Sequence, residues 1–239
     1  PSDPTQEQYV AARISARHPE LRITLSHSIG RMGILERENA ALLNASLLPL
    51  ADKVVSSFAS ALQERDIKCP FYISQNDGTL MSADFAAEFP ALTFASGPTN
   101  SLRGASLLTQ LDNAVVVDIG GTTSDIGVLQ DGFPRQSNIA IEVGGVRTNF
   151  RMPDIQSIGL GGGSLVKDGG ATIGPQSVGY RLVEDGLVFG GDTLTTTDVL
   201  VASGRALIGD KERVADLDAT VIKTATEKMH SIIDNGIDQ

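Results

Sequence analysis

The chain has 239 residues, of which 41% are hydrophobic and 20% are charged, so it can bury a sizeable core and does not have the composition of a disordered segment. Its 29 acidic and 19 basic residues give a formal net charge of −10, and no lysine- and arginine-rich stripe runs along it. We therefore expect neither a nucleic-acid partner nor an anionic membrane surface, since both are bound by basic patches.

The sequence carries few signals of its compartment. A single cysteine, Cys69, cannot form an internal disulfide, and its place before Pro70 and a predicted strand indicates a buried thiol. No apolar run approaches the roughly 18 residues of a membrane span. Residues 1–14 lack the basic-then-apolar layout of a secretory signal. We expect a cytoplasmic protein with no membrane partner.

Apolar spacing in the first half of the chain predicts helices that alternate with short strands. The strongest pattern is a helix over residues 43–62, which contains Pro49 and is expected to be kinked or divided there. His27 follows a predicted strand and is assigned a structural role. The other predicted elements are a helix capped by Asp3 or Thr5 and ending before Pro19, a strand over 22–26, a strand over 70–75, a short helix capped by Ser82 and stopped by Pro90, a strand over 92–95 and a helix through Leu107 and Leu108.

The segment Ala114–Gln130 carries the strongest functional signal. A valine-rich run ends at Asp118, a polar glycine-threonine turn follows, and Asp125 opens a second apolar run, which together predict a β-hairpin. Glycines let the backbone approach a ligand, and successive N–H groups with hydroxyls can bind an anion. A carboxylate on each side could hold a hydrated divalent cation with phosphates. The same residues are also ordinary in a purely structural turn.

After this hairpin, Asp131-Gly132 predicts a second tight turn, and alternation predicts short strands over 138–143 and 146–150. Three consecutive glycines over 161–163 indicate a close approach or unusual dihedrals. They are not a dinucleotide fingerprint, because Ser164 stands where its third glycine belongs. The last predicted elements are small hairpins over 167–189, a helix capped by the Thr195–Asp198 run and reaching Leu207, and a helix from Val214 to near Gly236.

Several motifs in fixed order carry a family resemblance. DIGGTTSD at 118–125 is followed by MPDIQSIGLGGGS, and ERENAALLNASLLPL, ISQNDGTLMSADFA, SGPTNSLRGA, IEVGGV and TTTDVLVASGR lie around them. From about residue 23 to residue 202 the chain resembles the hydantoinase A / 5-oxoprolinase family. That family comprises ATP-dependent hydantoinases and oxoprolinases, with related acetone and acetophenone carboxylase subunits.

The resemblance implies an α/β fold of the actin, hexokinase and Hsp70 type, with a ribonuclease H-like mixed sheet flanked by helices and additional β-hairpins. It implies ATP and Mg²⁺ as cofactors and ATP-driven opening of a cyclic amide. In that reaction, phosphorylation of the amide oxygen makes the ring carbon electrophilic for water. Phosphoryl transfer chiefly needs positioning and charge neutralisation, which a loop of this kind can supply.

The resemblance also implies site residues. Asp118 and Asp125 are expected to bind or orient the magnesium–water shell or to polarise the attacking group, and Asp154 is a further candidate metal ligand. The residues expected at the nucleotide are Gly120, Gly121, Thr122, Thr123 and Ser124 in the first loop and Gly161, Gly162, Gly163 and Ser164 in the second.

The chain departs from the family pattern in three places. No first D-x-G-G-T-x-T-D loop precedes Asp118, Gln156 stands where members commonly carry histidine, and the Cys-containing P-G-P-A-C-Y-like segment is missing after Gly174-Pro175. We therefore expect a fragment of a longer protein or a reduced relative. Residues 1–112 would form an N-terminal α/β part of the hydantoinase A domain, and residues 113–239 its phosphate-loop and glycine-rich part.

Three functions stay open at this point. The first is a subunit that hydrolyses hydantoin or 5-oxoproline with ATP. The second is a carboxylase subunit of the same family, which would phosphorylate a ketone enolate or bicarbonate. The third is a non-catalytic binding or assembly module that keeps the fold. The expected partners are a small cyclic amide, a hydantoinase B-type subunit and further copies in an oligomer.

Overall fold

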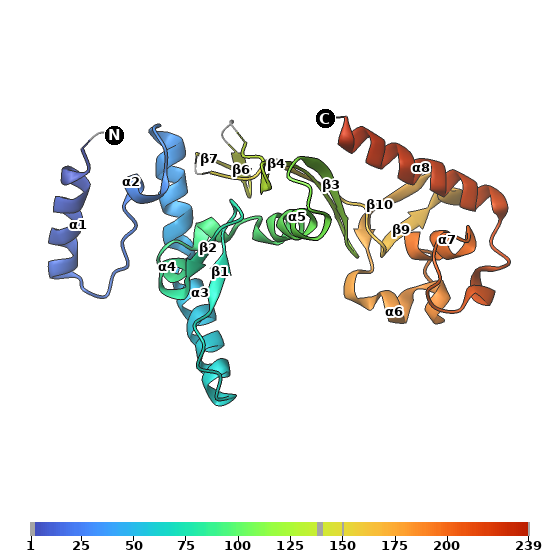
Figure 1. The fold of residues 1–239 in the computed structure, drawn as a ribbon, viewed down its shortest axis with the longest axis horizontal. Helices are drawn as coiled ribbons and strands as arrows, with labels where there is room; N and C mark the ends of the chain where they lie inside the picture. The colour runs from blue at the N-terminus through green and yellow to red at the C-terminus, as the bar shows by residue number, and fades with distance from the viewer. Residues whose placement is uncertain (1–2, 138–140, 150, 239) are drawn as a thin grey trace. The chain divides into compact units, whose positions relative to one another are not determined.

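The structure is a computed structural model that describes residues 3–137, 141–149 and 151–238 (Figure 1). The chain divides into two compact units, the first formed by residues 1–112 and 129–154 and the second by residues 113–128 and 155–239. Strand β4 (Ser124–Gln130) begins in the second unit and ends in the first. Neither unit is therefore a single continuous stretch of sequence.

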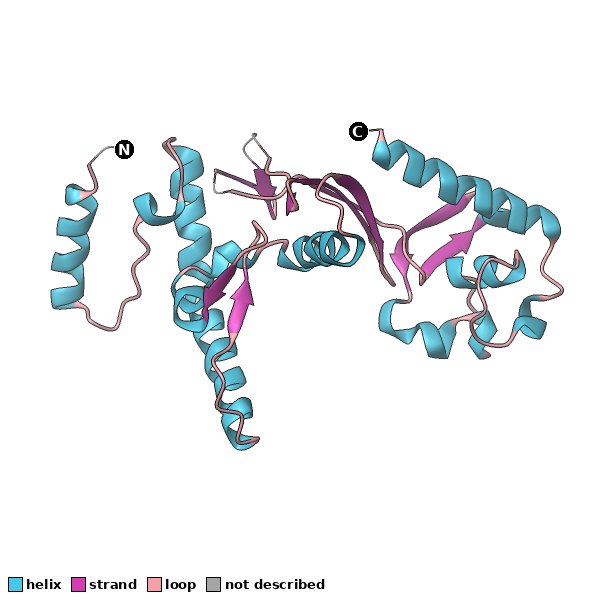
Figure 2. Ribbon diagram, in the orientation of Figure 1, coloured by secondary structure: helices cyan, strands magenta, loops and turns pink. Residues whose placement is uncertain are grey.

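The first unit is mainly helical (Figure 2). Its longest element, α3 (Leu35–Glu64), is one helix of 30 residues that continues through Pro49. Of the two effects predicted for Pro49, a kink or a division of the helix, the division does not occur, because a proline removes a single N–H donor and the other hydrogen bonds of a long helix remain. The other elements are α1 (Thr5–Arg17), α2 (Ser26–Ile29), β1 (Tyr72–Ser74), β2 (Leu80–Ser82), α4 (Ala83–Glu88), the 3-10 helix η1 (Pro90–Thr93), α5 (Ser96–Thr109), β5 (Phe133–Pro134), β6 (Ile141–Val143) and β7 (Val146–Thr148).

Several predictions for this unit are confirmed. The helices α1, α4 and α5 and the strand β1 form where expected, and the Ser82 hydroxyl accepts the N–H of Phe85 as a helix cap, at 3.2 Å. Asp131 and Gly132 join β4 to β5 with φ values of 52° and 76°, as a two-residue hairpin turn of this kind requires. The strands predicted over 138–143 and 146–150 form as β6 and β7 where the structure describes them, and residues 138–140 and 150 lie outside the described residues.

Two predicted strands do not form. Residues 22–25 are irregular and Ser26 begins α2, while the segment over 92–95 lies in η1 and in a turn before α5. Short apolar runs do not distinguish a strand from other buried segments. Beside η1, the buried side chain of Asn44 supplies backbone hydrogen bonds of the kind that a paired strand would otherwise provide. Its Oδ1 accepts from Ala91 N at 3.1 Å, and its Nδ2 donates to Glu88 O at 2.9 Å.

The prediction of a buried Cys69 is also wrong, since this thiol is exposed. The strand expected to bury it begins only at Tyr72, so Cys69 lies in the loop between α3 and β1. A residue in such a loop gains no cover from a pairing strand. A core cluster of the unit lies elsewhere and contains the buried residues Ile29, Ala40, Ala91 and Met152.

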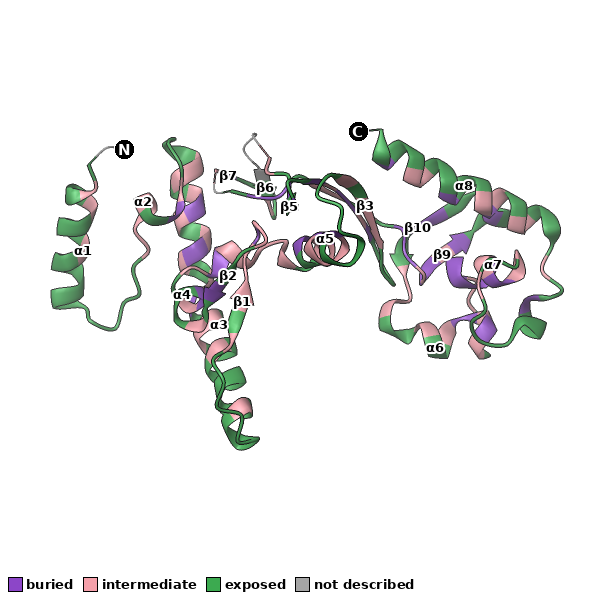
Figure 3. Cartoon of the chain, in the orientation of Figure 1, coloured by how far each residue is buried: buried purple, intermediate pink, exposed green. Residues whose placement is uncertain are grey.

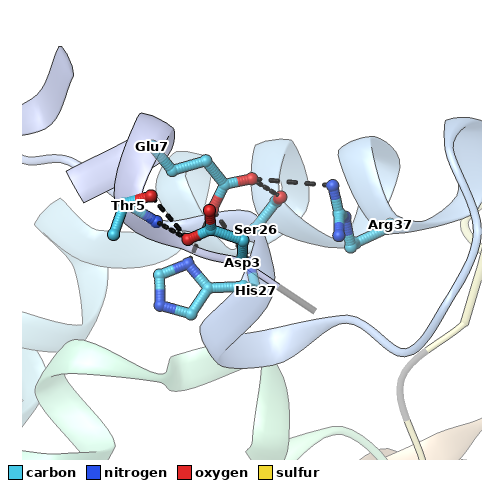
Figure 4. Close-up of polar contacts among 6 residues, drawn as sticks. All are labelled: Asp3, Thr5, Glu7, Ser26, His27 and Arg37. Carbon is cyan, nitrogen blue, oxygen red and sulfur yellow. Dashed lines mark hydrogen bonds and ion pairs between the residues drawn. The ribbon is translucent and has the colours of Figure 1, made fainter. Parts of the chain in front are cut away.

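Helix α1 is attached to its unit by polar contacts, because none of its residues is buried (Figure 3). Figure 4 shows the Glu7 carboxylate of α1 between two residues of α2 and one of α3. It accepts hydrogen bonds from the Ser26 hydroxyl and from His27 N at 3.2 Å, its Oε2 lies 2.7 Å from His27 Nδ1, and its Oε1 lies 3.6 Å from Arg37 Nη2. Burial opposes ionisation of Glu7, but these donors and the Arg37 charge outweigh it and lower its pKa to about 2.

The second unit contains the predicted hairpin, which is confirmed. Strand β3 (Ala114–Ile119) lies beside β4, whose other edge pairs antiparallel with β8 (Ile155–Ile158). The remaining elements are β9 (Ser164–Lys167), η2 (Asp168–Gly170), β10 (Thr172–Ser177), η3 (Gly179–Arg181), α6 (Leu182–Asp185), η4 (Leu187–Phe189), α7 (Thr196–Ala202), η5 (Lys211–Val214) and α8 (Ala219–Ile237).

The core of the second unit gathers where α8 and α7 pack with the β9–β10 hairpin. Its buried members are Leu160, Val166, Ile173, Val199, Ala225 and Met229. This packing fixes the start of β9 and the N-terminus of α7, which flank the triple glycine in space. Within the described ranges of the chain, no helix is both long enough and apolar enough to cross a membrane.

We predict that Glu7→Gln loosens α1, because the neutral amide loses the charge that Ser26, His27 and Arg37 stabilise. In the wild type, the folded-state pKa of Glu7 lies below its ordinary value of 4.5. Its contribution is therefore complete above about pH 4.5 and is lost as the pH falls toward 2. Hydrogen exchange of residues 5–17, measured across this range and corrected for intrinsic rates, should show the difference between variant and wild type shrinking with acidity.

The exposed Glu64 at the end of α3 provides the matched control, since Glu64→Gln removes a similar charge outside this cluster. Equal protection of α1 in the Glu7→Gln variant and the wild type at neutral pH would contradict the assignment.

Candidate functional site

The loop between β3 and β4 is exposed, whereas the residue after it is buried. Residues 120–123 all lie at the surface, and the loop is closed by a hydrogen bond from Gly120 N to Thr123 O at 2.9 Å. Ser124 has no exposed surface, and its hydroxyl donates to Leu160 O at 2.6 Å. Ser124 therefore anchors the loop in this structure, and its predicted contact with a nucleotide stays a prediction.

The triple glycine packs directly on this loop. Gly162 N donates to Gly120 O at 3.0 Å, and Gly163 N donates to Gly121 O at 2.7 Å. A Cβ on Gly161 would lie 2.5 Å from Thr122 N and 2.7 Å from Gly120 O, which no real side chain tolerates. The close approach expected of these glycines is thus an approach to the neighbouring backbone, and it requires the absence of side chains.

This pairing determines which way the loop presents its donors. In a trans peptide the C=O and N–H groups point in opposite directions, and the carbonyls of Gly120 and Gly121 point at the glycine turn. The N–H groups of Gly121 and Thr122 therefore point away from that turn. A Cβ on Gly121 would meet no atom within 4 Å, so a ligand can come close to the backbone there. Two backbone donors of the loop, the N–H groups of Gly121 and Thr122, thus face away from the glycine turn, while the carbonyls of Gly120 and Gly121 face it.

The N-terminus of α7 holds the glycine turn from the other side. The Thr196 hydroxyl donates to Gly161 O, and the Thr197 hydroxyl and N–H donate to Gly162 O at 2.8 and 3.0 Å. Thr195 and Asp198 form a capping box at the helix cap that the sequence predicts. The buried Asp198 carboxylate accepts from Thr195 N at 2.7 Å and from Val188 N at 2.8 Å, so the cap is also tied to η4.

Ser164 contributes to the same turn. It has no exposed surface, and its Oγ accepts the N–H of Gly161 at 2.9 Å. Its hydroxyl therefore stabilises the backbone of the turn in this structure. The nucleotide contact predicted for Ser164, like those predicted for Gly161, Gly162 and Gly163, is tested by no observation of the structure.

The three candidate aspartates lie in different surroundings. Asp118 ends β3 and Asp125 lies on β4, both half-buried, and the Ser157 hydroxyl donates to Asp125 Oδ1 from β8. Asp154 belongs to the first unit, where its Oδ2 accepts from Arg135 Nε at 3.0 Å and Nη2 at 2.6 Å. Over residues 3–137, 141–149 and 151–238, no three histidine, cysteine, aspartate or glutamate side chains form a group that could hold a metal ion.

The structure adds four hydroxyl residues that the sequence did not single out for the site. Ser157, Thr196 and Thr197 make the contacts given above. The Ser177 hydroxyl donates to Gly121 O at 3.4 Å and accepts from Gly179 N at 3.0 Å. The TTTD motif predicted only a helix cap, and nothing in the sequence indicates which strand Ser157 or Ser177 will lie beside.

We predict that Gly161→Ala destabilises the second unit by about 1–3 kcal/mol, the usual cost of forcing extra volume into a packed site. Gly121→Ala is the matched control, because it adds the same methyl group where nothing lies within 4 Å, and it should change stability by at most about 1 kcal/mol. The stabilities of the two variants would be compared by thermal unfolding and by hydrogen exchange over residues 114–130. Equal stability of the two variants would contradict the close contact.

The comparisons with known proteins agree with this architecture. The model of the family described as hydantoinase/oxoprolinase matches residues 37–237. Caprolactamase subunit alpha of Pseudomonas jessenii is 26% identical over 239 aligned positions, which cover 93% of this chain and 34% of that protein. The gamma subunit of acetophenone carboxylase from Aromatoleum aromaticum is 27% identical over 215 positions, covering 84% of this chain and 29% of that subunit.

An uncharacterized protein of Methanocaldococcus jannaschii is 29% identical over 197 positions, covering 74% of this chain and 28% of that protein. The chain thus spans about a third of the length of these relatives.

Two solved structures share the fold. The ATP-dependent caprolactamase of Pseudomonas jessenii superposes with a TM-score of 0.73 at 22% identity, over 96% of this chain and 37% of that one. Nucleotide-free acetone carboxylase superposes with a TM-score of 0.66 at 22% identity, over 98% of this chain and 37% of that one. The likeness shows that the chain shares the fold of these two proteins, and the predicted combination of helices and sheets in an α/β fold is confirmed. Because the family model covers most of its length, the chain belongs to the hydantoinase/oxoprolinase family.

Proposed function

We propose that the chain supplies the phosphate-binding loop of an ATP-dependent enzyme that opens a cyclic amide. The observation that carries this proposal is the orientation of the loop over 120–123. Its first two carbonyls are bound by Gly162 and Gly163, so the N–H groups of Gly121 and Thr122 face the other way. An exposed run of backbone donors with flanking hydroxyls suits phosphate oxygens.

The charge balance favours a bound cation as part of this site. The chain carries a net charge of −10, so a nucleotide must bind against the overall field. Continued along the hairpin, the pairing of Gly120 with Thr123 would set Asp118 opposite Asp125. Two carboxylates opposite each other repel unless a cation lies between or beside them. Mg²⁺ accepts one or two carboxylates together with phosphates, and when bound it would neutralise phosphate charge.

Each residue then has a defined part in the proposed site. Gly121 and Thr122 would bind phosphate oxygens through N–H groups, and the exposed hydroxyls of Thr122 and Thr123 would add donors. Asp118 and Asp125 would hold the hydrated Mg²⁺ or orient the attacking water. Asp154 is also predicted as a metal ligand, but its carboxylate pairs with Arg135. We therefore assign it no part in the proposed site.

The relatives support the reaction class and leave two versions of it. Caprolactamase is named for a lactam, which is a cyclic amide, and its structure is described as ATP-dependent. Acetophenone carboxylase and the ATP-dependent acetone carboxylase instead act on ketones. We favour cyclic-amide opening, with hydantoin, 5-oxoproline or a lactam as substrate, and keep ketone carboxylation as the alternative. The matched caprolactamase and acetophenone carboxylase chains are both named as subunits, which supports a proposed partner subunit of the hydantoinase B type.

Turnover experiments separate these versions. Purified protein, alone and with a co-expressed hydantoinase B-type subunit, would be assayed for ADP release with 5-oxoproline, hydantoin, caprolactam, and acetone plus bicarbonate. Release that depends on a cyclic amide supports the favoured reaction, and release that depends on ketone plus bicarbonate supports the alternative. Magnesium-dependent ATP binding without release under any condition would indicate the non-catalytic module.

We predict that ATP with Mg²⁺ raises the thermal midpoint of the chain. A ligand at 100 times its dissociation constant stabilises the folded state by about 2.7 kcal/mol. For a chain of this size that corresponds to a shift on the order of 5–10 °C. Differential scanning fluorimetry with ATP plus Mg²⁺, ATP plus EDTA, and Mg²⁺ alone measures it. No shift with millimolar ATP and Mg²⁺ would remove the phosphate-loop assignment.

We further predict that Asp118→Asn weakens magnesium-dependent ATP binding by at least about 10-fold, because the neutral amide is a poor ligand for a hard cation. Binding of ATP in EDTA should change little, since the backbone donors remain. Isothermal titration calorimetry of the wild type and of Asp118→Asn, each with Mg²⁺ and in EDTA, gives the four dissociation constants to compare. Asp112→Asn, an exposed aspartate in the loop before β3, is the control.

A further inference from the structure

Ser157 lies directly across the sheet from one of the two candidate carboxylates. In the β4–β8 ladder, Asp125 is paired with Ser157, and residues that face each other in an antiparallel ladder project from the same side of the sheet. The Ser157 hydroxyl donates to Asp125 Oδ1. The neighbouring Ser124 projects to the other side of the sheet, where it is buried and donates to Leu160 O. Asp125 and Ser157 therefore share the opposite side of the sheet.

We propose that Ser157 is a positioning residue, which fixes the Asp125 carboxylate for the Mg²⁺–nucleotide complex. This inference rests on the proposed phosphate-loop function. The second torsion of an aspartate side chain is broad, so an unrestrained carboxylate rotates between several orientations. A hydroxyl donor on Oδ1 selects one of them and leaves Oδ2 as the oxygen for the cation or for a water bound to it.

The assignment gives the two neighbouring serines different tasks. Ser124 ties the backbone of the phosphate loop to Leu160, and Ser157 acts on a side chain. Ser157 is itself exposed, so the contact is not a by-product of close packing in the core. A purely structural cross-strand pair would stabilise the sheet equally with and without the cation, and this difference separates the two explanations.

The test uses the full 239-residue chain with Ser157→Ala, Ser157→Thr and the control Ser231→Ala, an exposed serine on α8. The dissociation constant of ATP is measured by calorimetry with Mg²⁺ and again in EDTA. We expect Ser157→Ala to weaken binding about 10-fold with Mg²⁺, the scale typical of residues that orient metal ligands. We expect no more than about a twofold change in EDTA, and near wild-type constants for Ser157→Thr, which keeps the hydroxyl and suits a strand.

Each outcome has one meaning. If the wild type binds ATP with a clear dependence on Mg²⁺ and Ser157→Ala binds equally well, or weakens equally in EDTA, the positioning role is overturned and the phosphate-loop function stands. If the wild type shows no Mg²⁺-dependent binding, both are overturned. Should Ser157→Ala melt far below the wild type, Ser157→Cys replaces it under reducing conditions, because a thiol keeps the volume and is only a weak donor. The same selective loss is then expected.

Discussion

The second unit depends on one contact in which two stretches of backbone meet without side chains between them. Gly161 lies so close to Gly120 and Thr122 that a single methyl group would overlap their atoms. Hydrogen bonds from the glycine turn to two carbonyls of the loop then fix the loop's peptide planes. Because those planes are trans, fixing the acceptors inward also fixes the donors outward. The same contact thus produces local structure and the chemical character of the exposed surface.

The hydroxyl groups around this contact form a second layer of support. Thr196 and Thr197 bind the carbonyls of the glycine turn, and Ser177 reaches a carbonyl of the loop. The threonines are in turn held by the capping box of α7, whose buried Asp198 also binds η4. Since buried polar groups are costly when unpaired, this network holds a glycine-rich segment in one conformation despite its backbone freedom.

The two units use charge in opposite ways. In the first, the Glu7 carboxylate accepts hydrogen bonds from Ser26 and His27 and pairs with Arg37, and it attaches a helix that has no fully buried residue. In the second, Asp118 and Asp125 flank an exposed loop in an acidic chain, and in the proposed site they would hold a hydrated cation beside phosphate groups. The Glu7 carboxylate therefore serves the structure of its unit, whereas Asp118 and Asp125 are the carboxylates proposed for ligand chemistry.

The sequence by itself determined the local elements with clear signals: the hairpin around DIGGTTSD, the Asp131-Gly132 turn, the cap at Ser82, the cap of α7 in the Thr195–Asp198 run and the family. These depend on residues close in sequence or on motif order. Only the tertiary structure decided that residues 22–25 and 92–95 are not strands, that Cys69 is exposed, and that α3 runs through Pro49. It also decided that the glycines at 161–163 pack on the loop over residues 120–123 and that Ser157 faces Asp125. The contacts of the glycine turn and of Ser157 join residues about 30 to 40 positions apart, and no local pattern records which distant backbone supplies a hydrogen-bond partner. Whether a short apolar run pairs as a strand, or a thiol is covered from solvent, likewise depends on residues that are distant in the sequence.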